Sequence, residues 1–166
     1  NRNAKLLQRN GTSQHWTVHD VGSGQIPQGY GSDFGLCDGI VHAAIGRTTD
    51  FGTQGGVARF DLNSGSWLAD WDQGQGGLPH DFASGIACDE AYDIVYIGFQ
   101  EDDGSIARYD YVNLQFLAVL DEDDNVVSEP IFPGAMHHTG GTLLVGHFDG
   151  GGITLVGTTG AIVNTI

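Results

Sequence analysis

The sequence predicts an all-β fold built from repeats, and three observations support this prediction. First, the segments 57–72 ("VARFDLNSGSWLADWD") and 106–121 ("IARYDYVNLQFLAVLD") share one pattern of residue types. Second, all four prolines fall in three long connections, at positions 27, 79, 130 and 133. Third, short apolar runs such as 41–45, 94–97 and 143–145 are separated by Gly, Asn and Asp and show no helical period. Because proline cannot donate to a strand ladder, its positions mark loops between strands.

The repeating unit contains a second hairpin, which defines the architecture. Segments 35–47, 85–99 and 135–148 each read as a hairpin that precedes a copy of the first pattern, and weaker copies of that pattern lie at 4–20 and 153–166. A unit of about fifty residues with four antiparallel strands is typical of one blade of a β-propeller. We expect the innermost strands at 34–38, 85–89 and 135–139. The predicted division is an outer strand pair with its connection at 1–31, followed by blades at 32–83, 84–134 and 135–166.

The segment "GGLPHDFASGIACDEAYDIVYIGF" (76–99), followed by "IARYD" (106–110), resembles blades of the lactonase, quinoprotein and NHL-like propellers. The resemblance covers nearly the whole chain and implies the propeller fold. It implies no activity, because the Tyr-Val-Thr-Asn signature of one subgroup and the tryptophan docking motif of the quinoproteins are both missing. A β-sandwich or jelly roll with chance internal similarity is the alternative fold.

The number of blades predicts that the chain has partners. It holds about three and a half blades, whereas closed propellers contain four to eight. An open arc would leave apolar faces of its terminal blades in water. We therefore expect either the remainder of a larger propeller chain or a homo-oligomer that completes a ring.

Charge limits the classes of partner. The chain has 17 Asp and 4 Glu against one Lys and five Arg, for a net charge of −15. This composition excludes nucleic-acid binding through a basic patch and disfavours an anionic membrane surface. No window approaches 18 consecutive apolar residues, so we expect no membrane span. An Asp-rich, Lys-poor surface suits a halophilic or marine protein at the cell surface or outside the cell; an acidic secreted protein without salt adaptation is the alternative.

Sequence motifs identify no catalytic set. There is no zinc-type Cys or His spacing, no G-x-S-x-G, no phosphate loop and no complete EF-hand, and we assign no catalytic residues. Cys37 and Cys88 occupy matching positions of neighbouring inner strands, so we expect two free buried thiols, with a disulfide as the alternative. Arg59 with Asp61, and Arg108 with Asp110, are expected to form ion pairs at blade edges. Of His137 and His138, one should face the channel and the other the sheet packing, because strand side chains alternate.

The longest loops predict a ligand-binding rim on one face of the propeller, since rigid scaffolds carry binding groups on loops. The candidate ligand-binding residues there are Gln28, His80, Asp81 and His147. A calcium site is a further candidate, because carboxylate oxygens suit a hard cation; its ligands would be Asp50, Asp102, Asp103 and Asp149. No other cofactor is expected, and solvated acidic turns with nothing bound are the alternative.

Three function classes follow, in this order. The first is a propeller segment of a larger extracellular or surface protein that binds a protein, small molecule or carbohydrate, or acts as a scaffold. The second is a propeller enzyme of the hydrolase, lyase or lactonase kind, with its site at the channel mouth. The third is a self-assembling structural repeat. Fold alone does not choose among them.

Overall fold

The structure, a computed structural model, describes residues 5–9, 16–20, 30–46, 55–71, 78, 82–100, 105–120, 133–147, 152–157 and 162–165. All regular elements in these ranges are β-strands. They form three antiparallel four-stranded sheets and one two-stranded hairpin. The expected all-β propeller with about three and a half blades is confirmed. Among the described residues there is no helix that could cross a lipid bilayer.

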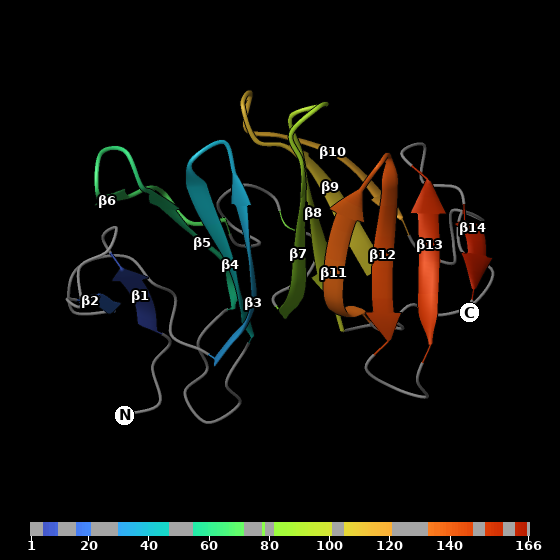
Figure 1. The fold of residues 1–166 in the computed structure, drawn as a ribbon, viewed down its shortest axis with the longest axis horizontal. Helices are drawn as coiled ribbons and strands as arrows, with labels where there is room; N and C mark the ends of the chain where they lie inside the picture. Colours follow the sequence, from blue (N-terminus) through green and yellow to red (C-terminus); the bar gives the residue numbers. More distant parts are fainter. Residues whose placement is uncertain are drawn as a thin grey trace.

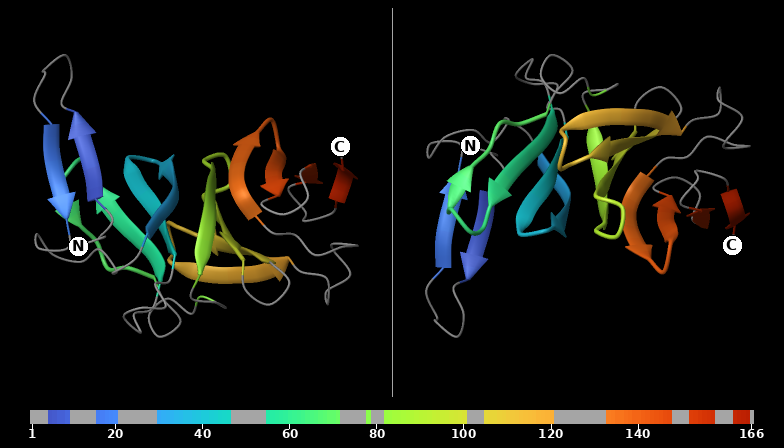
Figure 2. Two further views of the ribbon diagram at one scale, coloured as in Figure 1. Left: turned by 90° about the horizontal axis from the view of Figure 1, so that it is seen from below. Right: turned by 90° about the horizontal axis from the view of Figure 1, so that it is seen from above.

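Each four-stranded sheet is one blade, with its strands in chain order from the inside outwards. The first blade contains β3 (Tyr30–Cys37), β4 (Ile40–Gly46), β5 (Gly56–Asp61) and β6 (Ser66–Trp67). The second contains β7 (Ala83–Asp89), β8 (Ile94–Phe99), β9 (Ser105–Asp110) and β10 (Gln115–Leu120). The third contains β11 (Pro133–Thr139), β12 (Thr142–His147), β13 (Ile153–Gly157) and β14 (Ile162–Thr165). The hairpin of β1 (Lys5–Arg9) and β2 (Trp16–Asp20) lies beside the first blade, on the side away from the second (Figures 1 and 2).

The inner strands β3, β7 and β11 lie side by side in the middle of the molecule (Figure 1). Each begins earlier than expected, because each contains a bulge near its start that lengthens the strand: at 31–33, 83–85 and 133–135. Two of the bulged residues are serines that join neighbouring blades. Ser32 Oγ donates to the carbonyl of Ala83 at 3.0 Å, and Ser84 Oγ donates to the carbonyl of Pro133. Pro133 is the first residue of its strand, a position that tolerates proline, rather than a loop residue as predicted.

The bulges give a residue-by-residue alignment of the blades. Asp33, Gly85 and Ala135 follow the bulge and pair with Ala44, Gly98 and Gly146 respectively. Continuing along the strands, Phe34 corresponds to Ile86 and Met136, and Cys37 corresponds to Asp89 and Thr139. Cys88 therefore corresponds to Leu36, so the two cysteines are one residue apart in the repeat instead of equivalent.

Side-chain alternation along these strands builds the core between blades. One buried cluster joins the first two blades and includes Val57, Ile86 and Ile97. A second joins the second and third blades and includes Ile106, Met136 and Val145. The middle inner strand, β7, thus packs one set of alternate side chains against the first blade and the other set against the third.

The outer turns explain why the Asp of the repeated R-F/Y-D pattern recurs. Asp61 Oδ1 accepts from the backbone N–H of Asn63 at 2.8 Å, and Asp110 Oδ1 accepts from that of Asn113 at 2.7 Å. These bonds close the turns. Hydrogen bonding also lowers the pKa of both carboxyl groups. The largest contribution comes from a side-chain bond from Ser64 at Asp61 and from the backbone bond from Asn113 at Asp110. The predicted Arg–Asp ion pairs are wrong within the described strands, because the carboxylates are committed to the turns.

The outermost strand of the first blade is short. β6 covers Ser66–Trp67, whereas its counterpart β10 covers six residues, Gln115–Leu120. The chain returns to β5 at Trp71, which exchanges two backbone hydrogen bonds with Val57 at 2.8 and 2.9 Å. This return places the indole of Trp71 over the first blade, where it covers Arg59.

Candidate functional site

A groove of about 280 Å³ runs across the three inner strands, where the channel of a closed propeller would lie. Three residues from each strand line it: Phe34, Gly35, Leu36, Ile86, Ala87, Cys88, Met136, His137 and His138. Phe34, Leu36 and His137 are exposed, whereas Ile86 and Met136 are buried beneath them. The groove therefore combines exposed apolar side chains with one exposed imidazole, and its accessible surface is more polar than apolar.

The histidine pair of β11 divides as expected from strand alternation. His137 is exposed in the groove, whereas His138 turns towards the second blade and its side chain is 9% exposed. His138 Nε2 lies 3.3 Å from Oδ2 of Asp89, whose side chain is 2% exposed. Neither of these atoms has a hydrogen-bond partner in the described part of the structure, so the 3.3 Å approach is an ion-pair contact and not a hydrogen bond. The pair joins two blades through a carboxylate and an imidazole that are largely closed to solvent.

Tyr96 and Arg108 complete the polar layer between the second and third blades. The ring of Tyr96 stacks on that of His138, with centroids 5.9 Å apart and an interplanar angle of 23°. Burial raises the pKa of Tyr96, and the positive charge of Arg108 partly offsets this effect. Tyr96 pairs with Arg108 across β8 and β9, so both side chains emerge on the same face of the sheet as Asp89.

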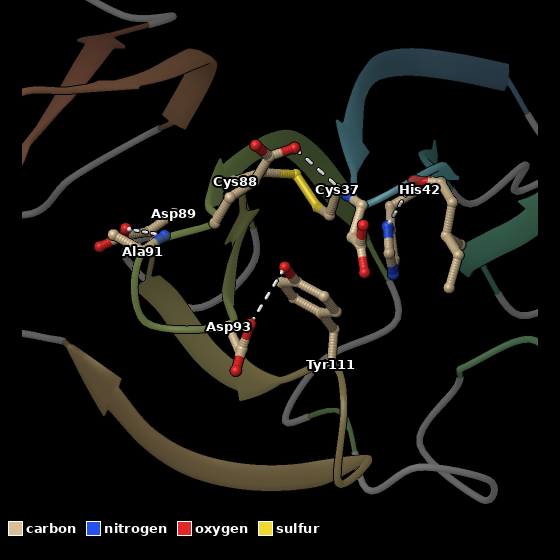
Figure 3. Close-up of a disulfide and its surroundings, with 10 residues drawn as sticks. Cys37, His42, Cys88, Asp89, Ala91, Asp93 and Tyr111 are labelled. Atoms are coloured by element: carbon tan, nitrogen blue, oxygen red, sulfur yellow. Dashed lines mark hydrogen bonds between the residues drawn. A yellow bond between two sulfur atoms is a disulfide. The ribbon is translucent and has the colours of Figure 1, made fainter.

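Between the first and second blades, the same layer is built around a disulfide. Cys37 and Cys88 are bonded, with Cα atoms 5.6 Å apart, and Figure 3 shows the bond running from β3 to β7. The expectation of two free thiols is wrong. Equivalent residues would point in the same direction around the ring, but the one-residue offset turns Cys37 towards the second blade and Cys88 towards the first. Gly35 leaves room for this contact, since a Cβ there would lie 3.1 Å from Cys88 Sγ.

His42 lies beside the disulfide and corresponds to Tyr96 in the next blade. Its ring is fully buried, 5.3 Å from the ring of Trp71 and 6.1 Å from that of Tyr111, measured between centroids. Burial, followed by the positive charge of Arg59, lowers the pKa of His42 to about 3. The neutral ring donates from Nδ1 to the Ile40 carbonyl at 3.3 Å, and Nε2 has no hydrogen-bond partner in the described part of the structure.

Arg59 is the first-blade counterpart of Arg108. Its guanidinium lies 4.4 Å from the ring centroid of Trp71 and donates from Nη1 to the Ala69 carbonyl at 3.4 Å. The side chain is 5% exposed, and burial lowers its pKa. Stacking on an indole is a favourable environment for a buried guanidinium. Among the described residues, no carboxylate forms an ion pair with it.

Most of the site predicted from sequence lies outside the described residues. Only His147 is described, at the end of β12, where Nε2 and the hydroxyl oxygen of Thr154 are 2.7 Å apart. Since Thr154 is buried, this bond ties β12 to β13. The other candidate ligand residues, Gln28, His80 and Asp81, and the candidate calcium ligands, Asp50, Asp102, Asp103 and Asp149, are not described by the structure.

Leu36, His42 and the Asp89–His138 contact were not predicted from the sequence. His42 carried no motif, because its neighbours Cys37 and Cys88 are brought to it by the packing of two blades. The Asp89–His138 contact depends on the bulges that set the register of β7 and β11. The repeat in the sequence does not reveal that His42 corresponds to Tyr96, because the connections to the Arg-containing strands differ in length; the strand pairing does, since His42 pairs with Arg59 and Tyr96 with Arg108.

Comparisons with known proteins support the fold. No protein-family model matches the chain, and no curated protein matches it. Among solved structures, the crystal structure of a nidogen/laminin complex matches with a TM-score of 0.63 at 12% identity, covering 92% of this chain and 51% of that chain. Myxococcus xanthus glutaminyl cyclase matches with a TM-score of 0.59 at 16% identity, covering 83% and 50%. The structure of U3-55K matches with a TM-score of 0.60 at 11% identity, covering 100% and 43%. The chain therefore has a β-propeller fold and spans about half the length, or less, of these chains.

Proposed function

We propose that this chain is the ligand-binding part of a larger β-propeller in an extracellular or surface protein, and that the ligand lies in the groove of the inner strands. The observation that carries the proposal is the groove of about 280 Å³ itself, which is lined by residues of all three inner strands and has a rigid wall. The disulfide and the buried Asp89–His138 contact tie the three strands that form this wall. A concave surface that combines apolar side chains with polar groups able to orient a ligand is a usual place for ligand binding.

The chemistry of the groove limits the ligand. A mixed surface, more polar than apolar, with the exposed side chains of Phe34 and Leu36 and one exposed imidazole, suits a molecule that has an apolar face and several hydrogen-bonding groups. A carbohydrate ring and a protein loop with one apolar side chain both meet this description. The net charge of −15 favours neutral or cationic ligands over anionic ones. The disulfide supports an oxidising compartment outside the cytosol.

One binding experiment distinguishes the groove from the loop rim predicted from the sequence as the location of the ligand site. Ligand-observed NMR against a panel of monosaccharides and small neutral fragments would identify binders of the wild-type chain. Loss of binding in His137→Ala, with His80→Ala and Asp81→Ala unchanged, is the expected result. Binding that survives His137→Ala but is lost in His80→Ala would place the ligand on the rim instead.

A second candidate function, assembly with further blades, is favoured by the two open ends. Phe34 is 71% exposed, whereas its counterparts Ile86 and Met136 are 2% and 8% exposed, each covered by the preceding blade. At the other end, Ile153 is 46% exposed, whereas its counterparts Val57 and Ile106 are 0% exposed. Residues that are core at both internal interfaces are therefore on the surface at the ends.

Light scattering tests assembly at micromolar concentration. We expect the wild type to associate, and Phe34→Asp and Ile153→Asp to weaken the association. Tyr92→Asp is the matched control, because Tyr92 is 66% exposed in the turn between β7 and β8, away from both open faces. A wild-type chain that is monodisperse and monomeric would contradict assembly with itself and would leave a longer chain as the source of further blades.

A further inference from the structure

Three ligand atoms of the kind that hold soft metal ions converge between the first and second blades. The Sγ atoms of Cys37 and Cys88 and one ring nitrogen of His42 lie within 4.8 Å of one another. Figure 3 shows His42 beside the sulfur pair, at the junction of β3 and β7. While the disulfide is closed, its sulfurs have no thiolate character and hold no metal ion. Reduction would convert this structural bond into two thiol ligands.

His42 supplies an independent indication of a ligand. Its ring is fully buried, yet Nε2 has no hydrogen-bond partner in the described part of the structure. A buried polar atom without a partner costs free energy and calls for an explanation. The Nδ1 bond to the Ile40 carbonyl is the arrangement that fixes ring orientation and tautomer in metal-binding histidines. Trp71 and Tyr111 further restrict the ring.

Charge selects the kind of ion. In the equivalent place between the second and third blades, the carboxylate of Asp89 lies in the same layer as Arg108. Between the first two blades, Arg59 is buried without a described carboxylate partner, and Cys37 stands at the position of Asp89. The two negative charges of the thiolates would balance the positive charges of one monovalent cation and of the Arg59 guanidinium. A divalent cation would instead leave a net positive charge among buried groups.

We propose that reduced Cys37 and Cys88, with His42, form a three-coordinate site for Cu(I). Thiolate ligands favour this soft ion. Among the described residues, the cluster contains no fourth His, Cys, Asp or Glu, which a tetrahedral structural zinc site would require. The Cα spacing of 5.6 Å allows both sulfurs to reach one ion by side-chain rotation. Cys88 also lines the groove, which gives the ion a path to the site.

The reactions balance with a phosphine as the reductant. The phosphine gives two electrons to the disulfide and becomes a phosphine oxide, taking its oxygen from water, while the two water protons form the two thiols. Cu(I) then displaces both thiol protons, which pass to solvent. Oxygen or another disulfide can reverse the first step, so metal binding is coupled to the redox state of the chain.

The experiment is an anaerobic competition titration of the full chain with Cu(I) bicinchoninate, followed by absorbance. We expect one equivalent to bind after phosphine treatment and none to the oxidised chain. His42→Gln should weaken binding by at least about tenfold, and Cys37→Ser or Cys88→Ser should abolish it. His137→Ala is the matched control, an exposed groove histidine outside the cluster, and should bind as the wild type does.

A second measurement keeps the proposal testable if a variant fails to fold. Copper K-edge absorption of the reduced wild type should show two sulfur ligands and one imidazole nitrogen. Binding by the oxidised chain, equal affinity in His42→Gln, or a spectrum without sulfur would overturn the proposal. Tighter binding of Zn²⁺ than of Cu(I) in a matched competition would overturn the choice of ion.

Discussion

Asp89 and His138 meet at the position between the second and third blades that Cys37 and Cys88 occupy between the first and second. The carboxylate oxygen and ring nitrogen are 3.3 Å apart, and both side chains leave inner strands one repeat after the cysteines. One interface is thus closed by a covalent bond and the next by a polar contact at the same point of the ring. This equivalence rests on the bulges of β3, β7 and β11. It can be tested by replacing the polar contact with a second disulfide.

We expect the double variant Asp89→Cys with His138→Cys to form a second disulfide. The sites stand in the same relation as the native cysteines, so their Sγ atoms should reach bonding distance. Alkylation of the denatured, unreduced variant followed by mass spectrometry should find no free thiol. Asp89→Cys with His137→Cys is the matched control, because residue 137 projects from the opposite face of β11; its added thiols should be labelled. Equal pairing in both variants would contradict the register.

Breaking the native disulfide should destabilise the chain substantially. The bond closes a loop between residues 51 apart in sequence, and the loss of this constraint on the unfolded chain corresponds to about 4 kcal/mol. Urea unfolding of the wild type with and without a phosphine reductant measures the difference, and Cys88→Ser should match the reduced form. An unchanged midpoint would show that the blade interface does not depend on the bond.

Because the pKa of His42 is lowered in the folded chain, we expect the chain to lose stability in mild acid. The pKa of His42 is about 3 in the folded chain, against 6.5 for an unperturbed histidine. Between these values the unfolded chain binds a proton that the folded chain does not, so stability falls as pH falls, by about 1.4 kcal/mol per pH unit. Above pH 6.5 the ring is neutral in both states and the effect vanishes.

His42→Gln is the test of this prediction, because glutamine does not titrate. Urea unfolding at several pH values from 7 to 4 should give curves for the wild type and variant that converge as pH falls. A constant offset between the two, caused by altered packing, would appear at every pH and does not affect the argument. Parallel curves would show that His42 is protonated without cost in the folded chain.

The repeat made the fold predictable, because each blade carries the same hairpins and the same turn aspartates. The first residue of each inner strand was harder to predict from the sequence. β7 begins at Ala83 and β11 at Pro133, since a bulge adds a residue that no composition signal marks. The same bulges decide which way Cys37 and Cys88 face. Matching "CD" at 37–38 to "CD" at 88–89 was therefore misleading: Asp38 is exposed in a turn with φ 46°, whereas Asp89 is buried in a strand.

The candidate site was harder to predict than the fold for a related reason. The loops were chosen because scaffolds carry binding groups on loops, but the groove is made by strand residues from three blades. Leu36 and His137 are 101 residues apart, and only blade packing brings them to one groove. Leu36 lies on the face of β3 that a preceding blade would cover, and His137 lies on the face of β11 that a following blade would cover, so predicting their exposure needs the register and not the composition.

The last prediction compares two equivalent glycines, Gly98 and Gly146, which face the following blade. A Cβ at Gly98 would lie 2.5 Å from Cβ of Pro133 and 3.3 Å from Sδ of Met136, so Gly98→Ala must push the third blade away. Overpacking of this kind costs about 1–3 kcal/mol. A Cβ at Gly146 would meet its nearest neighbour, the Ala135 carbonyl oxygen, at 3.5 Å, an ordinary contact. Urea unfolding should therefore show a clear loss for Gly98→Ala and little change for Gly146→Ala in the isolated chain. If Gly146→Ala is equally destabilising at high protein concentration but harmless on dilution, another blade packs against the open face of the third blade, over β12, in the assembled state. Equal loss at every concentration would contradict the open face.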